Sequence, residues 1–324
     1  MTTRYTVEQL RAAAADAVRA PSLHNTQPWR FRLVDGGIDL AVDPLRRLPA
    51  TDPSGWGARI ACGAALFNLR LALAVAGTPA TVRLRPYPGD PDVVARLVPD
   101  APRRPTPAEQ SLHGAIGRRF SNRAPFWPDP VPGDARWRLG EAAHAEQCWL
   151  ELVIGTSAVN ALAEIARSAH RVLERDPGYV TERTRWIRSE PSPDGVPTAA
   201  GGPRSEPQDL LPQRGFGGRD RAPGRDFEPE PLVAVLGSAG NTAADQVVAG
   251  QALQRVLLTA TDAGLAVSML SQPIEVPGAR EALRLSLGRF GTPQMVMRIG
   301  FGQPGRTTPR RPVDDVLDLP VVPA

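Results

Sequence analysis

Two short polar segments carry residue types that could bind an anionic ligand. The first is Gly117-Arg118-Arg119-Phe120-Ser121-Asn122-Arg123, at the end of a helical pattern. Guanidinium groups bind phosphate oxygens through paired hydrogen bonds, and a serine hydroxyl adds a further donor. If the stretch is extended, Arg119, Ser121 and Arg123 point to one side. Taken alone, the segment is compatible with a phosphate site and equally with a solvated surface loop.

The second segment is Ala20-Pro21-Ser22-Leu23-His24-Asn25-Thr26-Gln27-Pro28-Trp29. Pro21 and Pro28 restrict the backbone, so the polar side chains between them are presented at a low entropic cost. The segment predicts either a rigid polar rim for a planar ligand or a structured turn with Trp29 in the core.

A third group of arginines follows the last predicted strand, at Arg306, Arg310 and Arg311. These residues could reach an anion, or they could form a charged tail.

The composition excludes several other chemistries. The chain has 324 residues and 38 basic side chains, and the printed sequence contains no lysine, so every basic side chain is arginine. Schiff-base enzymes and ordinary Walker A ATPases, which need a lysine, are therefore excluded. Codon bias would explain the missing lysine equally well. The formal net charge is only +4, and no basic run is interleaved with aromatic residues, which argues against nucleic acid as a partner.

Metal and nucleophile signatures are missing from the sequence. The four histidines lack ligand-like spacing, and no GxSxG motif occurs. Gly300–Gly305 matches GxGxxG, but Pro304 and Pro309 prevent the helix that a dinucleotide site requires. Two cysteines in apolar contexts, no signal peptide and no stretch long enough to span a bilayer predict a cytoplasmic protein.

Hydrophobic periodicity predicts two similar α+β halves, residues 1–108 and 109–324. The first half is expected to contain a helix over Val7–Val18, strands over Trp29–Val34 and Ile38–Val42, a long apolar helix over Gly57–Ala76, a strand over Thr81–Arg85 and a short helix over Asp92–Leu97. The second is expected to contain a helix over Glu109–Arg118, a strand over Trp149–Ile154, a helix over Ala158–Leu173, a strand over Leu232–Leu236, a long helix over Gln246–Ala263, a strand over Leu265–Met269, a helix over Gly278–Leu287 and a strand over Gln294–Ile299.

An insertion over residues 191–231 interrupts the second half. It is dense in Pro, Gly, Arg and Asp and has almost no apolar periodicity. A loop of this length inside a compact domain is usually functional or disordered. The insertion is therefore interpreted either as a lid over a pocket or as a flexible segment without a function of its own.

Together, these segments resemble the nitroreductase-like FMN flavoprotein superfamily, and most of all its Acg-type tandem-repeat branch. Members carry an Arg-x-Ser-x-Arg/Lys segment that holds the FMN phosphate and flavin edge, which Arg119, Ser121 and Arg123 match. Members also carry an Ala-Pro-Ser-x-x-Asn-x-Gln-Pro-Trp segment that approaches the flavin from the partner subunit. The residues of this chain in that segment are Pro21, Ser22, Leu23, Asn25, Gln27, Pro28 and Trp29.

The resemblance implies further cofactor contacts. Ser271 and Gln272 fall in the loop that brings a backbone donor near flavin N5, where many reductases have an acidic residue followed by glycine. Arg310 and Arg311 correspond to the basic residues that reach the phosphate after the last strand. Because lysine is absent, Arg123 would supply the positive charge beside the flavin ring.

The implied fold is a nitroreductase-like α+β fold, in which two tandem repeats form a pseudo-dimer around the two long helices. Each main motif occurs in one half only, so the resemblance implies one composite flavin site per chain. A further homodimer is left open.

The implied function is an FMN-dependent oxidoreductase. NADH or NADPH would reduce the flavin at N5, and a nitroaromatic or quinone-like small molecule would accept the electrons in a ping-pong cycle. The alternative is an FMN-binding protein without turnover, for storage or sequestration, whose site the insertion covers. An FMN-dependent dehydrogenase that runs the chemistry as an oxidation is also compatible with these residues.

Overall fold

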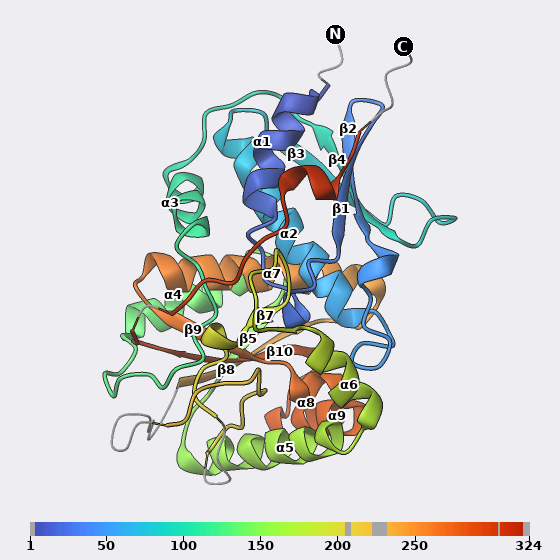
Figure 1. Cartoon of the computed structure of the whole chain (residues 1–324). Coiled ribbons are helices and arrows are strands. Elements are labelled where there is room, and N and C mark those ends of the chain that lie inside the picture. The colour runs from blue at the N-terminus through green and yellow to red at the C-terminus, as the bar shows by residue number, and fades with distance from the viewer. Residues whose placement is uncertain (1–3, 205–208, 222–231, 304, 320–324) are drawn as a thin grey trace.

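The computed structural model describes residues 4–204, 209–221, 232–303 and 305–319, and it confirms the predicted α+β class (Figure 1). Five strands form the first sheet in the order β11-β1-β2-β4-β3. Their bounds are β1 (Trp29–Val34), β2 (Gly37–Val42), β3 (Ala80–Leu84), β4 (Val93–Pro99) and β11 (Leu317–Asp318). Asp35 and Gly36 both have positive φ angles and join β1 to β2 in the tight hairpin that the sequence predicts.

Two helices pack against this sheet. Helix α1 (Val7–Ala17) begins at a capping box between Thr6 and Gln9, and its buried residues Leu10 and Ala14 recur at helical spacing. Helix α2 (Trp56–Val75) is apolar on most sides. It is long and apolar enough to cross a membrane by composition, but most of it is buried inside the protein.

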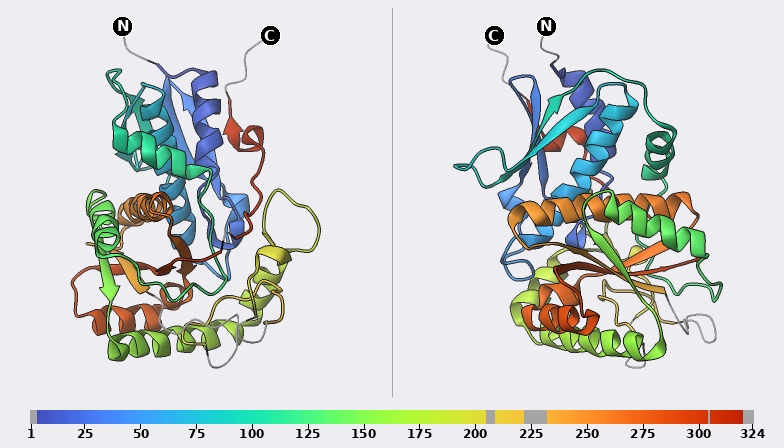
Figure 2. Two further views of the ribbon diagram at one scale, coloured as in Figure 1. Left: turned by 90° about the vertical axis from the view of Figure 1, so that its left-hand side faces the viewer. Right: turned by 180° about the vertical axis from the view of Figure 1, so that it is seen from behind.

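Four strands form the second sheet in the order β5-β8-β10-β9. Their bounds are β5 (Trp149–Val153), β8 (Leu232–Ser238), β9 (Ala266–Leu270) and β10 (Thr292–Gly300). Helices α4 (Gly133–His144) and α7 (Ala243–Asp262) cover one face (Figures 1 and 2). The other face is covered by α5 (Thr156–Glu174), α8 (Gln272–Glu275) and α9 (Pro277–Leu287).

The remaining elements connect the two sheets and the helices that cover them. Helix α3 (Pro107–Ile116) follows the proline-rich linker and begins at a capping box. Helix α6 (Pro177–Arg185) is followed by β6 (Ile187–Arg188), which pairs with β7 (Val196–Pro197) inside the insertion. The insertion residues 205–208 and 222–231 lie outside the described part.

Helices α2 and α7 cross at two glycines, Gly63 and Gly250. A Cβ atom on Gly63 would lie 2.2 Å from the Val247 carbonyl oxygen, and one on Gly250 would lie 2.2 Å from that of Ile60. Only glycine permits this close approach of the two backbones. The predicted pairing of the long helices is thus present, while the division into two tandem repeats stays a prediction.

Two features differ from the expected layout. Asp92–Leu97 was expected as a helix, which is wrong: the segment belongs to β4, where Val93 and Val94 pack between β2 and β3. The β-branched pair favours a pleated sheet position over a helix. In addition, β11 pairs with β1 in parallel, so the C-terminal segment returns to the first sheet.

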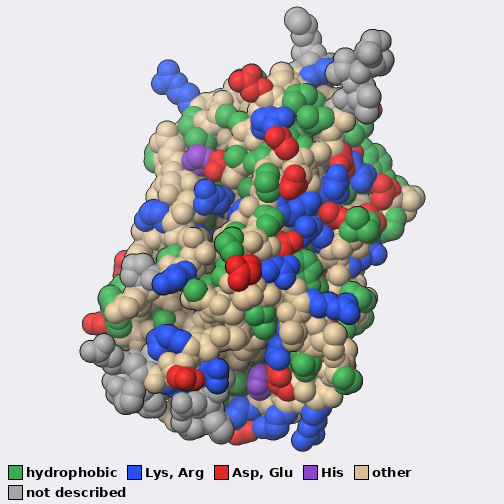
Figure 3. Space-filling view, in the orientation of Figure 1, with side chains coloured by type: hydrophobic (Ala, Val, Ile, Leu, Met, Phe, Trp, Pro, Cys, Tyr) green, Lys and Arg blue, Asp and Glu red, His purple; other side chains and the backbone are tan. Residues whose placement is uncertain are grey.

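Arginines are distributed over the surface together with acidic side chains. On the face in Figure 3, basic and acidic groups lie interspersed. The described salt bridges include exposed pairs such as Arg284 with Glu281 and Arg138 with Asp262. Such solvent-exposed ion pairs contribute little to folding stability. The buried arginines are therefore the better candidates for binding an anion.

Candidate functional site

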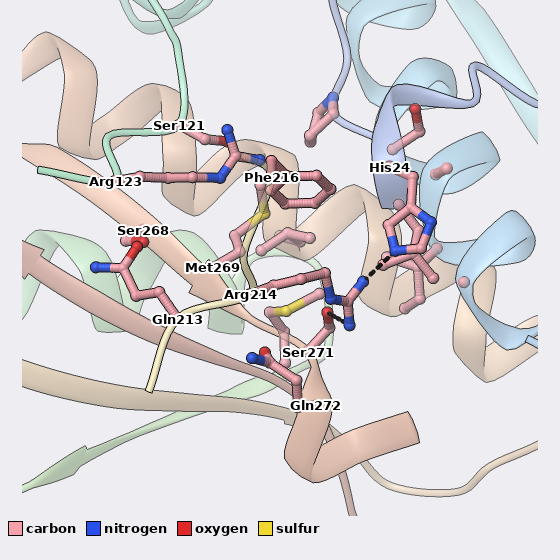
Figure 4. A pocket seen from close by; sticks show the side chains of 18 of the residues that line it. His24, Ser121, Arg123, Gln213, Arg214, Phe216, Ser268, Met269, Ser271 and Gln272 are labelled. Atoms are coloured by element: carbon pink, nitrogen blue, oxygen red, sulfur yellow. Dashed lines mark hydrogen bonds between the residues drawn. The ribbon is translucent and has the colours of Figure 1, made fainter. Parts of the chain in front are cut away.

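A cavity of about 90 Å³ is lined by four parts of the chain that carry polar or charged side chains (Figure 4). The first is Pro21–His24, which lies beside the start of α2 at Trp56. The second is Ser121 and Arg123, and the third is the end of β9 with Ser271 and Gln272. Insertion residues Gln213, Arg214 and Phe216 close the cavity.

The Pro21–Pro28 segment is held in an unusual backbone conformation. His24, Asn25 and Gln27 have φ angles of 52°, 56° and 53°. Residues other than glycine adopt such angles at a cost, which is common at binding sites. The Ser22 hydroxyl accepts a hydrogen bond from the Gln27 N–H at 2.9 Å and so closes the turn.

Asn25 and Gln27 lie outside the cavity lining, and their side chains bind other segments of the chain. The Asn25 amide donates to the carbonyls of Gly195 at 2.9 Å and Pro309 at 3.1 Å. The Gln27 amide donates to Pro193 at 2.9 Å and accepts from the Arg311 N–H at 2.8 Å. These two residues therefore join the polar turn, the insertion and the C-terminal segment.

The Arg119–Arg123 segment runs beside β9. Ser121 forms a parallel bridge with Val267, and the Asn122 N–H donates to the Val267 carbonyl at 2.9 Å. Ser121 and Arg123 line the cavity, whereas Arg119 is not among the lining residues and donates to the Arg19 carbonyl at 3.2 Å. The three side chains are thus close along the chain but do not share one face of the cavity.

Arg310 approaches the same carbonyl as Arg119. Its Nη2 donates to Arg19 at 3.2 Å and to Ala20, beside the cavity, at 3.1 Å. Arg119 Nε and Nη1 and Arg310 Nε are buried without a partner, and neither guanidinium has a carboxylate partner in the described part of the chain. Burial lowers the pKa of Arg119 to about 10; burial and the charges of Arg119 and Arg19 lower that of Arg310 to about 9.

Arg311 is differently placed. Its Nη2 donates to the Asp315 carbonyl at 2.7 Å, and its Nη1 lies 3.7 Å from the Asp43 carboxylate. Its charge is therefore partly neutralised, in contrast to that of Arg310.

Insertion residue Arg214 joins three parts of the site. Its Nη1 lies 2.6 Å from His24 Nε2, and its Nη2 donates to Glu275 at 2.5 Å and to Ser271 Oγ at 3.3 Å. Burial, with the charge of Arg214 as the next cause, holds the pKa of His24 well below its usual range. His24 is therefore neutral and accepts the hydrogen bond of Arg214. Gln272 also joins the insertion to the site, because its amide donates to the Pro212 carbonyl at 3.3 Å.

Phe216 fills the space between Arg123 and His24. The Arg123 guanidinium lies 4.7 Å from the centre of the Phe216 ring, and the His24 ring centre lies 5.7 Å from it with the two rings nearly perpendicular (Figure 4). Arg123 also donates to the Ala200 carbonyl at 3.0 Å. Burial and the charge of Arg214 lower the pKa of Arg123 to about 10.

Sequence reasoning missed several residues of this site. His24 stood inside the polar segment but outside the matched motif positions. Arg214 and Phe216 lie in a segment without periodicity, where only an aromatic residue among glycines could have indicated burial. Trp56 was assigned to no element, and it lines the cavity at the start of α2.

Comparison with known proteins gives full-length relatives in Mycobacterium tuberculosis. A protein of strain H37Rv provisionally named NAD(P)H nitroreductase Rv3131 is 34% identical over 97% of this chain and 92% of its own. The protein provisionally named NAD(P)H nitroreductase acg is 32% identical over 98% of this chain and 97% of its own. No family model matches the sequence.

Solved structures give weaker similarities. A Bacteroides fragilis nitroreductase with bound FMN has a TM-score of 0.39 at 15% identity, covering 62% of this chain and 92% of that one. A Desulfitobacterium hafniense nitroreductase with bound FMN has a TM-score of 0.40 at 15% identity, covering 62% and 93%. These values are too low to transfer a ligand to this chain.

Proposed function

Since the chain belongs to the Acg-type nitroreductase family, we propose that it binds FMN and acts as an oxidoreductase with NADH or NADPH as electron donor. The names of the relatives support the donor. The acceptor in this proposal is a nitroaromatic or quinone-like small molecule.

One observation carries the proposal: Arg119 and Arg310 converge on one carbonyl with three buried, unpartnered nitrogens between them. A buried cation is costly unless an anion compensates it. The phosphate of FMN carries about two negative charges and accepts bidentate hydrogen bonds from guanidiniums. Arg119 and Arg310 would therefore hold the phosphate, with Ser121 as a further donor.

The ring of FMN fits the site only if the insertion moves. Pockets that enclose ligands of this size have volumes of about 300–1,000 Å³, whereas the cavity has about 90 Å³. Phe216 occupies the face of Arg123 on which a planar ring could stack. We infer that a bound flavin takes the place of the Phe216 ring.

The chain's own residues would then position the cofactor and control access to it. FMN supplies two-electron redox chemistry when it is bound. Arg123 would provide a positive charge beside the ring, and Pro21, Ser22 and Leu23 would form a rigid rim. Ser271 and Gln272, at the start of α8, would border the opposite side. Asn25, Gln27 and Arg311 would support this rim rather than bind the cofactor directly.

The purified protein tests the first part of this proposal. It should be yellow and contain about one FMN per chain, as measured by absorbance after release of the flavin. A colourless protein that does not take up added FMN would exclude the proposed function.

A second candidate function is flavin storage without turnover. The observation that favours it is the insertion, which Arg214 fastens to Glu275 and His24 over the cavity. Anaerobic mixing of the holoprotein with NADPH or NADH separates the two candidates. Rapid loss of the oxidised-flavin absorbance supports a reductase, and a stable absorbance supports storage.

A further inference from the structure

A second hollow, of about 700 Å³, lies next to the cavity described above. Trp56 lines both of them. Three helices begin at this groove: Trp56 starts α2, Asn241 and Gln246 flank the start of α7, and Pro277 starts α9. None of the residues proposed to hold FMN lines the groove.

Arg280 is the cation of this groove, and its hydrogen-bond acceptors are all neutral. Its Nε donates to the Pro293 carbonyl at 2.8 Å, and its Nη2 donates to the side chains of Asn241 at 3.1 Å and Gln294 at 2.7 Å. Trp56 donates to the same Gln294 oxygen at 2.8 Å. Within the described residues, Arg280 has no carboxylate partner and its Nη1 makes no hydrogen bond. Burial lowers its pKa to about 10.

Arg59 adds a second guanidinium behind the groove. Its Nε donates to Gln246 Oε1 at 2.6 Å, and its Nη2 donates to the Ser54 carbonyl at 2.7 Å. The Gln246 amide in turn donates to Asn241 Oδ1 at 3.0 Å, the same oxygen that Arg280 binds. A pair of neutral amides therefore joins the two guanidiniums, and the charge of Asp52 partly offsets that of Arg59.

Each acidic residue that lines the groove interacts with a group other than Arg280. Glu275 pairs with Arg214 and Glu281 with Arg284. Asp52 accepts from the Ala58 N–H at 3.0 Å, and burial raises its pKa to about 6. Among the described residues, none of these carboxylates forms an ion pair with Arg280, so its guanidinium is the group in the groove that lacks an anionic partner.

Helix α9 adds to the positive electrostatic potential around Arg280. It has 11 residues, and no side chain caps its N-terminus at Pro277. The first amide groups of a helix lack partners and carry partial positive charge. The volume of the groove lies within the range of small-molecule sites and exceeds what a free phosphate ion requires.

We propose that this groove is a second binding site, which takes the phosphate group of a phosphate-bearing small molecule against the guanidinium of Arg280. Arg59 strengthens the positive potential, and the uncapped end of α9 supplies further donors. Trp56 also lines the cavity proposed to hold the flavin, so the two proposed sites share this residue.

Isothermal titration of the protein as purified, first with inorganic phosphate and then with AMP, tests this proposal. Saturable binding of both, with AMP the tighter, is expected for a site that takes a phosphate ester. Arg280→Gln should weaken both by about tenfold or more, the size expected for a lost charge-assisted hydrogen bond. Arg59→Gln should weaken them by a smaller factor. Binding of neither probe to the wild type, or equal binding to Arg280→Gln, would overturn the proposal.

Two control variants separate this site from its surroundings. The double variant Arg284→Gln with Glu281→Gln removes an ion pair from the same helix without changing net charge, and it should bind phosphate as the wild type does. Arg119→Gln should weaken FMN binding but keep phosphate binding in the groove, whereas Arg280→Gln should show the reverse. Loss of groove binding in either control would contradict the assignment to Arg280.

Discussion

Arg214 Nη1 and His24 Nε2 lie 2.6 Å apart, joining two residues separated by 190 positions in the sequence. The contact fastens the insertion to the strained polar turn. It requires a neutral His24, because a protonated ring would present a second cation to Arg214. The charge state of one histidine is therefore linked to the closure of the cavity.

Folding stability should decrease as the pH falls below about 6.5. His24 titrates near 6.5 in an unfolded chain, but its pKa in the folded chain is well below that. The unfolded state thus binds more protons in this range, and it gains up to about 1.4 kcal/mol per pH unit relative to the folded state. Denaturant unfolding at about pH 7 and pH 5.5 measures the effect.

His24→Asn is the matched variant, because asparagine tolerates the positive φ angle and still offers an acceptor to Arg214. In the variant, the free energy of unfolding should decrease less between about pH 7 and pH 5.5, because the contribution of His24 is absent. Asp52, whose raised pKa favours the folded state as the pH falls below about 6, acts in the opposite direction. It is present in both proteins and cancels in the comparison. An unchanged pH dependence would show that His24 is not the titrating group.

Phe216→Ala should bind FMN faster than the wild type. The Phe216 ring covers Arg123, and its removal opens space for a planar ligand. The variant should also be less stable by about 3–5 kcal/mol, because the side chain is buried. Stopped-flow quenching of flavin fluorescence gives the association rate. Phe290→Ala, at a position 98% exposed, is the control and should match the wild type; equal rates for both variants would argue against a covering role for Phe216.

Gly63→Ala should destabilise the protein by about 3 kcal/mol or more, since overpacking at this crossing would force the backbones of α2 and α7 apart. Gly114→Ala is the matched control: Gly114 lies in α3 with no atom within 4 Å of an added Cβ. It should gain about 0.5–1 kcal/mol from the better helix propensity of alanine. Urea unfolding of the two variants measures both effects, and similar stabilities would refute the close crossing.

Local sequence patterns predicted most of the regular elements, because long apolar helices and hairpin turns are encoded over short distances. The failures depended on tertiary context. Val93–Pro99 became a strand because it pairs with neighbours on both sides. Helices α4 and α6 were not predicted. Helix α6 carries few apolar positions, whereas the buried Ala135, Leu139, Ala142 and Ala143 of α4 do recur at helical spacing. No local signal could indicate that β11 returns to the first sheet.

The site was predictable only in part for the same reason. The two polar motifs identified Pro21, Ser121 and Arg123, which do line one cavity. Whether Arg310 or Arg311 is free to bind an anion depends on the ion pair between Arg311 and Asp43, which only the fold creates. The role of Arg214 also depends on contacts with residues distant in the sequence.

The affinity of the protein for FMN relative to riboflavin tests the proposed phosphate site most directly. Riboflavin has the same ring but no phosphate. The wild type should bind FMN at least about tenfold tighter, and Arg119→Gln and Arg310→Gln should each reduce this preference. The exposed neighbour Arg118→Gln should retain it. Equal affinities of the wild type for FMN and riboflavin would contradict the assignment of Arg119 and Arg310 to the phosphate.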